Sequence, residues 1–175
     1  MTIRDATPND LPSIGRIYVL GHWAAYRGHV PISNLRAMDA TVEAASFAPE
    51  LNNPNATFLV AINSRARVVG FALGGPTGAA DPTLAGLAEL FVERQYWGRG
   101  PASLLLQALS QRMAASGMTR MKGPVAIVNA RSRAFCQKHG AHEVNNGDWF
   151  AVFGNVAGFQ PLNLNAVWEE WAPLP

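Results

Sequence analysis

The sequence predicts an α/β fold in which a mixed sheet carries helices on its faces. Two observations lead to this fold class. Apolar runs of strand length alternate with helical patterns, and one apolar strand leads through a glycine-rich turn directly into a helix. A chain of 175 residues is long enough for one hydrophobic core. We therefore expect a single domain over residues 1–175, with the element order β-α-α-β-β-β-α-β-α-β-β.

The first half of the chain is expected to hold two helices and four strands. Thr7, followed by Pro8 and an early Asp10, is typical of a helix start. Glycines and prolines are frequent over 74–82, which predicts a loop. The expected elements are a strand over 2–6, a helix ending near 25, a weaker helix over 35–47, and strands over 56–62, 67–73 and 87–92.

The second half alternates more regularly. Leu105, Leu109 and Met113 recur at helical spacing within a predicted helix over 101–116, and Gly117 suits its C-terminal cap. The remaining expected elements are a strand over 124–128, a helix over 130–139, and strands over 149–153 and 166–171.

The composition argues against several classes of protein. Hydrophobic residues make up 49% of the chain and charged residues 15%, which is typical of a compact globule. The net charge of +2, without a Lys/Arg cluster, gives no reason to expect a nucleic-acid partner. No apolar run approaches the roughly 18 residues of a membrane span, and no secretory signal is visible, so we expect no membrane partner. Cys136 is the only cysteine, which fits a reducing cytoplasm, and the four histidines show no metal-binding spacing.

The turn after the predicted strand ending at Val92 is the most informative segment. Gly98 and Gly100 let the backbone approach an anion, and the helix that follows adds unpaired N–H donors and a partial positive charge. The chain has no Gly-Lys-Ser/Thr triplet, and Ser103 stands where a dinucleotide fingerprint needs its third glycine. Both common nucleotide motifs therefore fail, and an ordinary strand-to-helix turn is the alternative reading.

The same segment resembles the acetyl-CoA loop of the GNAT superfamily of N-acetyltransferases. That loop reads Arg/Gln-x-x-Gly-x-Gly/Ala, and here Trp97, Gly100 and Ala102 take the three defined places. Trp97 departs from the family pattern, although the loop acts mainly through its backbone. Pro101 lacks an N–H donor but suits the first helical turn.

A later segment resembles a second motif of the same family, Asn-x-x-Ser/Ala-x-x-Phe-Tyr-x-Lys/Arg-x-Gly-Phe. The matching residues are Asn129, Ser132, Phe135, Lys138 and Gly140. Ala141 replaces the final Phe, and Cys136 stands in place of the Tyr that the family commonly uses to protonate the leaving CoA thiolate. Two motifs in the expected order are far more specific than either alone.

The resemblance implies a mostly antiparallel twisted sheet and direct transfer of an acetyl group from acetyl-CoA, used as a co-substrate, to a primary amine of a small molecule or peptide. It implies no metal, and closing strands rich in Trp and Phe suggest a homodimer. A catalytically weakened acyl-CoA-binding regulatory module is the alternative, because Cys136 has replaced Tyr. The expected cofactor-binding residues are Phe91, Val92, Trp97, Gly98, Arg99, Gly100, Ala102, Ser103, Asn129 and Arg133.

Two residues are candidates for the chemistry itself. Cys136 follows Asn129 and Arg133 at helical spacing, so we expect it to face the cofactor as a proton donor; a space-filling role and a covalent nucleophile are alternatives. Glu89 is a candidate base for the incoming ammonium, or else a paired structural carboxylate. Strand alternation places Glu89 and Val92 on opposite faces.

His22, Trp23 and Tyr26 follow the first predicted helix, where the family shapes its acceptor site. We expect them to bind the substrate, with simple helix packing as the alternative.

Overall fold

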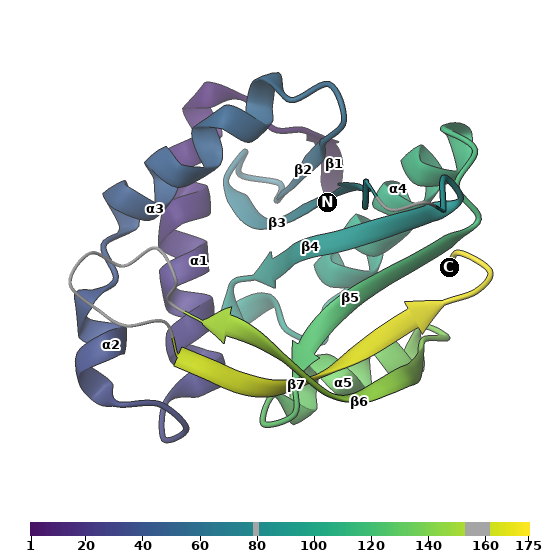
Figure 1. The fold of residues 1–175 in the computed structure, drawn as a ribbon. Helices are drawn as coiled ribbons and strands as arrows, with labels where there is room; N and C mark the ends of the chain where they lie inside the picture. Colours follow the sequence, from purple (N-terminus) through teal and green to yellow (C-terminus); the bar gives the residue numbers. More distant parts are fainter. Residues whose placement is uncertain (79–80, 153–161) are drawn as a thin grey trace.

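The structure is a computed structural model that describes residues 1–78, 81–152 and 162–175, and the side chains of residues 145–163 are outside this description. Figure 1 shows the elements in chain order. They are β1 (Thr2–Asp5), α1 (Leu11–Tyr26), α2 (Ile32–Ala37), α3 (Ala40–Phe47), β2 (Thr57–Ile62), β3 (Val68–Pro76), β4 (Leu84–Val92), α4 (Pro101–Ala115), β5 (Arg120–Ala126), α5 (Ala130–Lys138), β6 (His142–Val152) and β7 (Leu162–Trp171).

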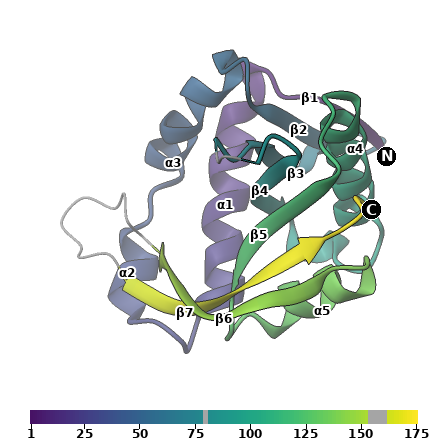
Figure 2. The ribbon, with the colours of Figure 1, turned by 45° about the vertical axis from the view of Figure 1, so that its right-hand side comes forward.

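The strands in the described residues form one seven-stranded sheet in the order β1-β2-β3-β4-β5-β7-β6. Only β4 and β5 pair in parallel, and every other neighbouring pair is antiparallel. Both views place α1 and α3 together on one side of the sheet and α4 on the other (Figures 1 and 2). The predicted fold class, a mixed and mostly antiparallel sheet with helices on both faces, is confirmed.

Each face of the sheet has its own apolar core. The predicted apolar face of α4 is buried, since Leu105, Leu109 and Met113 are at most 2% exposed. They pack on β2–β5 residues such as Val69 and Met121. On the opposite face, the residues packed between α1, α3 and the sheet are Ile14, Ile17, Phe47, Phe58 and Phe71.

The single helix expected over 35–47 is wrong, because two helices occupy this segment. The side chain of Asp39 accepts hydrogen bonds from the backbone N–H groups of Thr41, at 2.7 Å, and Val42, at 3.1 Å. Asp39 thus caps a new helix, α3, after α2 has ended at Ala37.

Several strand boundaries also differ from the prediction. β5 begins at Arg120 and carries Pro124 in its interior, beyond the residues that pair with β4. β6 begins at His142, earlier than expected, and two bulges against β7, at Val144 and Gly147, lie in this added part of the strand. Of the strand expected over 149–153, Phe153 lies outside the described residues. β7 begins at Leu162, and β3 continues to Pro76 into the expected loop.

The centre of the sheet opens between β4 and β5. Residues 84–86 pair with residues 120–122, and no pairing joins the rest of these two described strands. β4 also contains a bulge, because Leu73 pairs with Glu89 while Gly74 pairs with Leu87, which leaves Ala88 as the extra residue. After this bulge Val92 packs in the core under α4 and Phe91 in the core under α1. Glu89 therefore shares the α1 face with Phe91, opposite Val92, as alternation predicts.

Candidate active site

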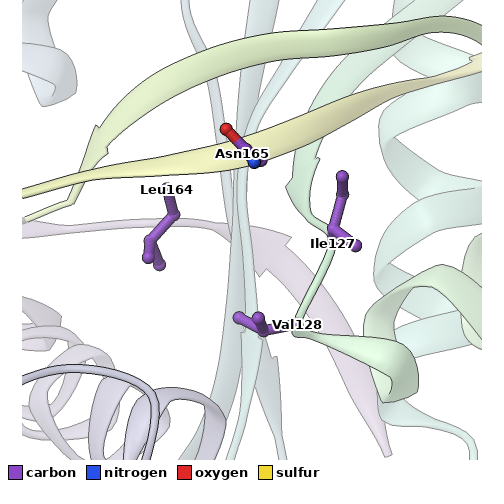
Figure 3. Close-up of a pocket in the computed structure, with 4 residues that line it drawn as sticks. All are labelled: Ile127, Val128, Leu164 and Asn165. Carbon is purple, nitrogen blue, oxygen red and sulfur yellow. The ribbon is translucent and has the colours of Figure 1, made fainter.

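A cavity of about 1380 Å³ lies where β4 and β5 have separated. Its walls come from α1, α3, β4, β5, the start of α4 and α5. Figure 3 shows a smaller pocket of about 280 Å³, lined by Ile127, Val128, Leu164 and Asn165. Val128 lines both, and the smaller pocket has no titratable lining residue in the described chain. The chemistry therefore belongs to the larger cavity.

One end of this cavity is built from the glycine-rich turn. Gly98 and Gly100 have φ angles of 70° and 99°, a left-handed conformation that L side chains rarely adopt. Gly100 is the N-cap of α4, so the N–H groups of Ala102 and Ser103 have no partner within the helix. Gly98, Gly100, Ala102 and Ser103 all line the cavity. The predicted anion cradle thus faces the cavity, at the positive end of a helix.

Trp97 holds this turn against the sheet. Its indole Nε1 donates a hydrogen bond to the carbonyl oxygen of Val92 at 2.9 Å, across the mouth of the turn. The guanidinium of Arg131, from α5, lies 4.3 Å from the centroid of the Trp97 ring, a cation–π contact. Sequence reasoning did not single out Arg131, because nothing in the chain reveals which loop the start of α5 packs against.

A second contact joins α4 to α5 beside the turn. The Nε2 atom of His139 lies 2.8 Å from the hydroxyl oxygen of Ser103, while Nδ1 lies 2.9 Å from the carbonyl oxygen of Phe135. A carbonyl oxygen only accepts, so the proton of a neutral ring sits on Nδ1 and the Ser103 hydroxyl donates to Nε2. His139 therefore positions the first turn of α4, and it does not form a pair with Cys136.

Asn129 has a structural role at the edge of the cavity. Its side-chain oxygen accepts a hydrogen bond from the N–H of Ser132 at 3.2 Å and so caps α5. Its side chain also hydrogen bonds to the hydroxyl of Tyr26, which ties the end of α1 to the start of α5.

The structure does not bring Arg133, Arg99 or Trp23 to the cavity wall. The guanidinium of Arg133 pairs with Glu143 of β6 at 2.9 Å and lies 4.0 Å from Glu169 of β7, so its expected contact with the cofactor stays a prediction. Arg99 is exposed, and Trp23 packs beside the buried Tyr26. None of the three belongs to the cavity lining in the described residues.

The other end of the cavity is aromatic. The ring of His22 stacks on Phe91 with centroids 5.3 Å apart, and Tyr18 and Tyr26 flank it at 4.2 and 5.5 Å. Burial lowers the pKa of His22 to about 4, so the ring is neutral at physiological pH. Its Nδ1 donates to the carbonyl oxygen of Tyr18 at 3.0 Å. His22 and Tyr26 line the cavity as the sequence predicts, together with Tyr18, which it did not.

Two carboxyl groups face the same aromatic end. Burial raises the pKa of Glu89 to about 8, and the negative charge of Glu43 adds to the shift. Burial likewise raises the pKa of Glu43, which is 7% exposed and comes from α3. The sequence carries one indication of this position: Glu43 lies on the same side of α3 as the buried Ala44 and Phe47.

Cys136 lines the cavity from α5 and is 4% exposed. Burial is the main reason that its pKa rises to about 12, and the charge of Glu169 adds to the rise. The thiol is therefore neutral at physiological pH, and nucleophilic catalysis needs a thiolate. The residue is placed to hydrogen bond to a ligand or to fill space.

No group of three or more His, Cys, Asp or Glu that could hold a metal ion occurs in 1–78, 81–152 and 162–175. No helix in these ranges is both long and apolar enough to cross a membrane.

Comparison with known proteins agrees with this geometry. The model of the acetyltransferase (GNAT) family matches residues 22–141, and the chain therefore belongs to this family. It is a GNAT acetyltransferase, as the two sequence motifs indicate. No curated protein matches the chain at the significance required.

Solved structures of low sequence identity share the fold. PaiA N-acetyltransferase from Thermoplasma acidophilum, in complex with coenzyme A, is 16% identical with a TM-score of 0.77 over 98% of both chains. YncA from Salmonella typhimurium, with its cofactor acetyl-CoA, is 21% identical with a TM-score of 0.70, over 98% of this chain and 93% of that one. Phosphinothricin acetyltransferase from Sinorhizobium meliloti, in complex with acetyl-CoA, is 23% identical with a TM-score of 0.70, over 98% and 88%.

Proposed function

We propose that this protein transfers the acetyl group of acetyl-CoA directly to a primary amine of a small molecule or peptide. One observation carries the proposal: a single cavity joins the start of α4, with its unpaired N–H groups, to Glu89, a carboxyl group whose pKa is raised to about 8. Phosphates belong at the first end, and an amine that must lose a proton belongs at the second.

The co-substrate is held at the turn between β4 and α4. The N–H groups of Gly98, Gly100, Ala102 and Ser103 receive the pyrophosphate, and the basic side chains of Arg131 and Lys138 line the same end of the cavity. The pantetheine arm runs along the edge of β4 near Phe91 and Val92, where β5 has moved away. An amide-containing arm suits this edge because a strand without a neighbour presents backbone donors and acceptors.

Glu89 acts as the general base. Its pKa of about 8 lies between that of an ordinary carboxyl group and that of an alkyl ammonium, about 10, so it accepts a proton far more readily than an exposed glutamate. The amine, once neutral, attacks the thioester carbonyl of acetyl-CoA. The carbon–nitrogen bond forms, the carbon–sulfur bond breaks, and CoA leaves as the thiolate.

Cys136 is a poor source for the proton that the thiolate finally takes. A thiol of ordinary pKa, about 8.5, does not take a proton from a group whose pKa is about 12. The amine loses a second proton as the amide forms; we assign that proton, relayed through solvent, to the thiolate, and give Cys136 at most a hydrogen bond to the sulfur.

The raised pKa of Cys136 supports the second candidate, a regulatory module that binds acyl-CoA with little turnover. A family position commonly occupied by an acid holds a residue that is buried and weakly acidic. Both candidates are placed in the cytoplasm, which the single cysteine supports, with no membrane partner and no nucleic-acid partner, the latter supported by the small net charge of +2.

The test incubates the purified protein with acetyl-CoA and a panel of primary amines. Direct transfer predicts that released thiol and acetylated amine appear in equal amounts, while the intact mass of the protein is unchanged when amine is absent. An acetyl group that accumulates on Cys136 and is removed by an amine contradicts direct transfer. CoA binding without turnover of any amine supports the regulatory module instead.

A further inference from the structure

The two ends of the cavity carry opposite charge. Arg131 and Lys138, both from α5, line the end beside the phosphate turn, whereas Glu43 and Glu89 line the aromatic end. A polarised cavity of this kind attracts an anionic ligand at one end and a cationic ligand at the other. The acceptor end therefore selects for positive charge.

Among the described residues, neither acceptor-end carboxylate has a counter-charge. In the part of the chain that the structure describes, no salt bridge or hydrogen bond involves the side chain of Glu43 or of Glu89. Other buried carboxylates each lie beside an arginine: Asp10 beside Arg4, Glu93 beside Arg16, Glu170 beside Arg120, and Glu169 at 4.0 Å from Arg133. A carboxylate that is 93% or more buried is costly without a partner, so a partner from outside is expected at Glu43.

The undescribed segments bring no basic residue. Residues 145–163 contain no Lys, Arg or His, and residues 79 and 80 are alanines. Whatever their arrangement, these residues cannot neutralise the two glutamates. The ligand is left as the source of positive charge.

The walls around the two carboxylates suit an alkyl ammonium ion. Burial is the main reason that the pKa of Tyr18 is raised, and the charges of Glu89 and Glu43 add to the shift. The Tyr18 ring therefore lies near the two carboxyl groups. The rings of His22, Tyr26 and Phe91 complete this part of the lining. Aromatic faces attract cations and also cover methylene groups. The lining thus offers charge at two points and an apolar surface around them.

We propose that the acceptor is an aliphatic diamine or polyamine, whose reacting nitrogen faces Glu89 and whose second ammonium group pairs with Glu43. This inference rests on the proposed function and names the substrate class of that site. An acceptor carrying its own carboxylate is disfavoured, because that charge would be desolvated beside two glutamates. Burial is the main reason that the pKa values of Glu43 and Glu89 are raised, and a bound dication offsets this cost because it supplies positive charge beside both carboxyl groups.

The experiment compares acceptors that differ only in the second charge. Diaminoalkanes of three to six carbons are each matched with the alkylamine in which a methyl group replaces the second amino group, and with the corresponding ω-amino acid. Thiol release at saturating acetyl-CoA gives kcat/KM for each. The best diamine should exceed its alkylamine by about 10- to 100-fold, the effect of one hydrogen-bonded charge pair, and exceed the amino acid by more.

A variant tests the assignment of the second charge. Glu43→Gln should bring the ratio of kcat/KM for diamine over alkylamine close to one, mainly through a higher KM for the diamine. Glu50→Gln is the matched control, because Glu50 is a neighbouring carboxylate outside the cavity lining, bonded to Asn53 at 2.9 Å. It should preserve the wild-type ratio.

The outcomes separate this proposal from the function on which it rests. Alkylamines acetylated as well as diamines, or an unchanged ratio in folded Glu43→Gln, overturn the acceptor class and leave the acetyltransferase standing. No thiol release from any acceptor, by protein that binds CoA, overturns both. The wild-type comparison needs no variant, so it decides even if Glu43→Gln does not fold.

Discussion

Glu89 is partly exposed and lines the cavity. Protein atoms surround the rest of the side chain, and this burial raises its pKa to about 8. Because the folded-state pKa lies above the ordinary value, Glu89 stabilises the fold most below about pH 4.5, and the contribution is lost as pH rises through about 8. The same shift makes it a usable base near neutral pH.

The first prediction concerns the pH profile of this residue. In the wild-type enzyme, kcat/KM should rise about tenfold per pH unit up to about 8 and then level off until the amine itself titrates near 10. In Glu89→Gln the step at 8 should vanish, and kcat/KM should climb continuously towards the pKa of the amine. At pH 7 the variant should lose about 100-fold or more.

Steady-state kinetics from pH 6 to 10, with CoA affinity as the check on folding, measures this profile. A variant that keeps the wild-type step shows that another group titrates, and the base assignment then fails.

At the residue scale, the sequence predicted the cofactor end better than the acceptor end. Gly98, Gly100, Ala102 and Ser103 lie in one contiguous turn that lines the cavity, so a motif read along the chain locates them. Glu43 escaped notice because its approach to Glu89 depends on how α3 packs against α1, which no local pattern states. These placements are geometric, and the roles of the residues stay predictions.

The α4 helix begins and ends beside a glycine with positive φ. Gly100 (99°) precedes its first residue, and Gly117 (85°) follows shortly after its end. Neither position has a neighbouring atom within 4 Å of an added Cβ, so the strain of an alanine comes from the backbone in both. Only Gly100 lines the cavity. The two glycines form a matched pair of positions on one element.

The prediction for this element is that Gly100→Ala and Gly117→Ala lower the free energy of unfolding by similar amounts, roughly 1–2 kcal/mol. Only Gly100→Ala should weaken CoA binding, by about 10-fold or more, because it displaces N–H donors from a charged phosphate. Calorimetry with CoA and thermal unfolding measure the two effects. Equal CoA affinity in both variants would falsify the assignment of the turn.

Element boundaries could be predicted where local signals agree. The apolar spacing, Pro101 and Gly117 together located α4 almost to the residue. The apolar composition of residues 35–47 predicted one helix, but α2 ends at Ala37 and Asp39 caps a second helix, α3. The start of β6 was missed because Asn146 and Gly147 are residues typical of turns. Here they lie within β6, at a bulge against β7. Register with a partner strand is a long-range property.

At the scale of the whole molecule, the alternation of elements predicted the mixed sheet, and the two motifs predicted the family. The strand order, in which β7 lies between β5 and β6, could not be read from the chain. It leaves β6 at an edge of the sheet, and β6 spans His142–Val152 with no proline or lysine. Long edge strands without such residues readily pair with another chain.

The last prediction is a homodimer that uses this edge. Of the aromatic residues that suggested it, Trp171 is 1% exposed and belongs to the core, while the side chains of Trp149 and Phe150 are outside the description. Of the three β6 residues whose side chains are described, 142–144, Val144 is apolar and 44% exposed. Light scattering at micromolar concentration should give twice the 18.8 kDa chain mass.

Val144→Lys should shift the mass to the monomer, because a buried unpaired ammonium is costly at an interface. Val42→Lys, at a 59% exposed position on α3, is the control and should stay dimeric. A wild-type mass near 18.8 kDa refutes the dimer, and a dimeric Val144→Lys moves the interface away from β6.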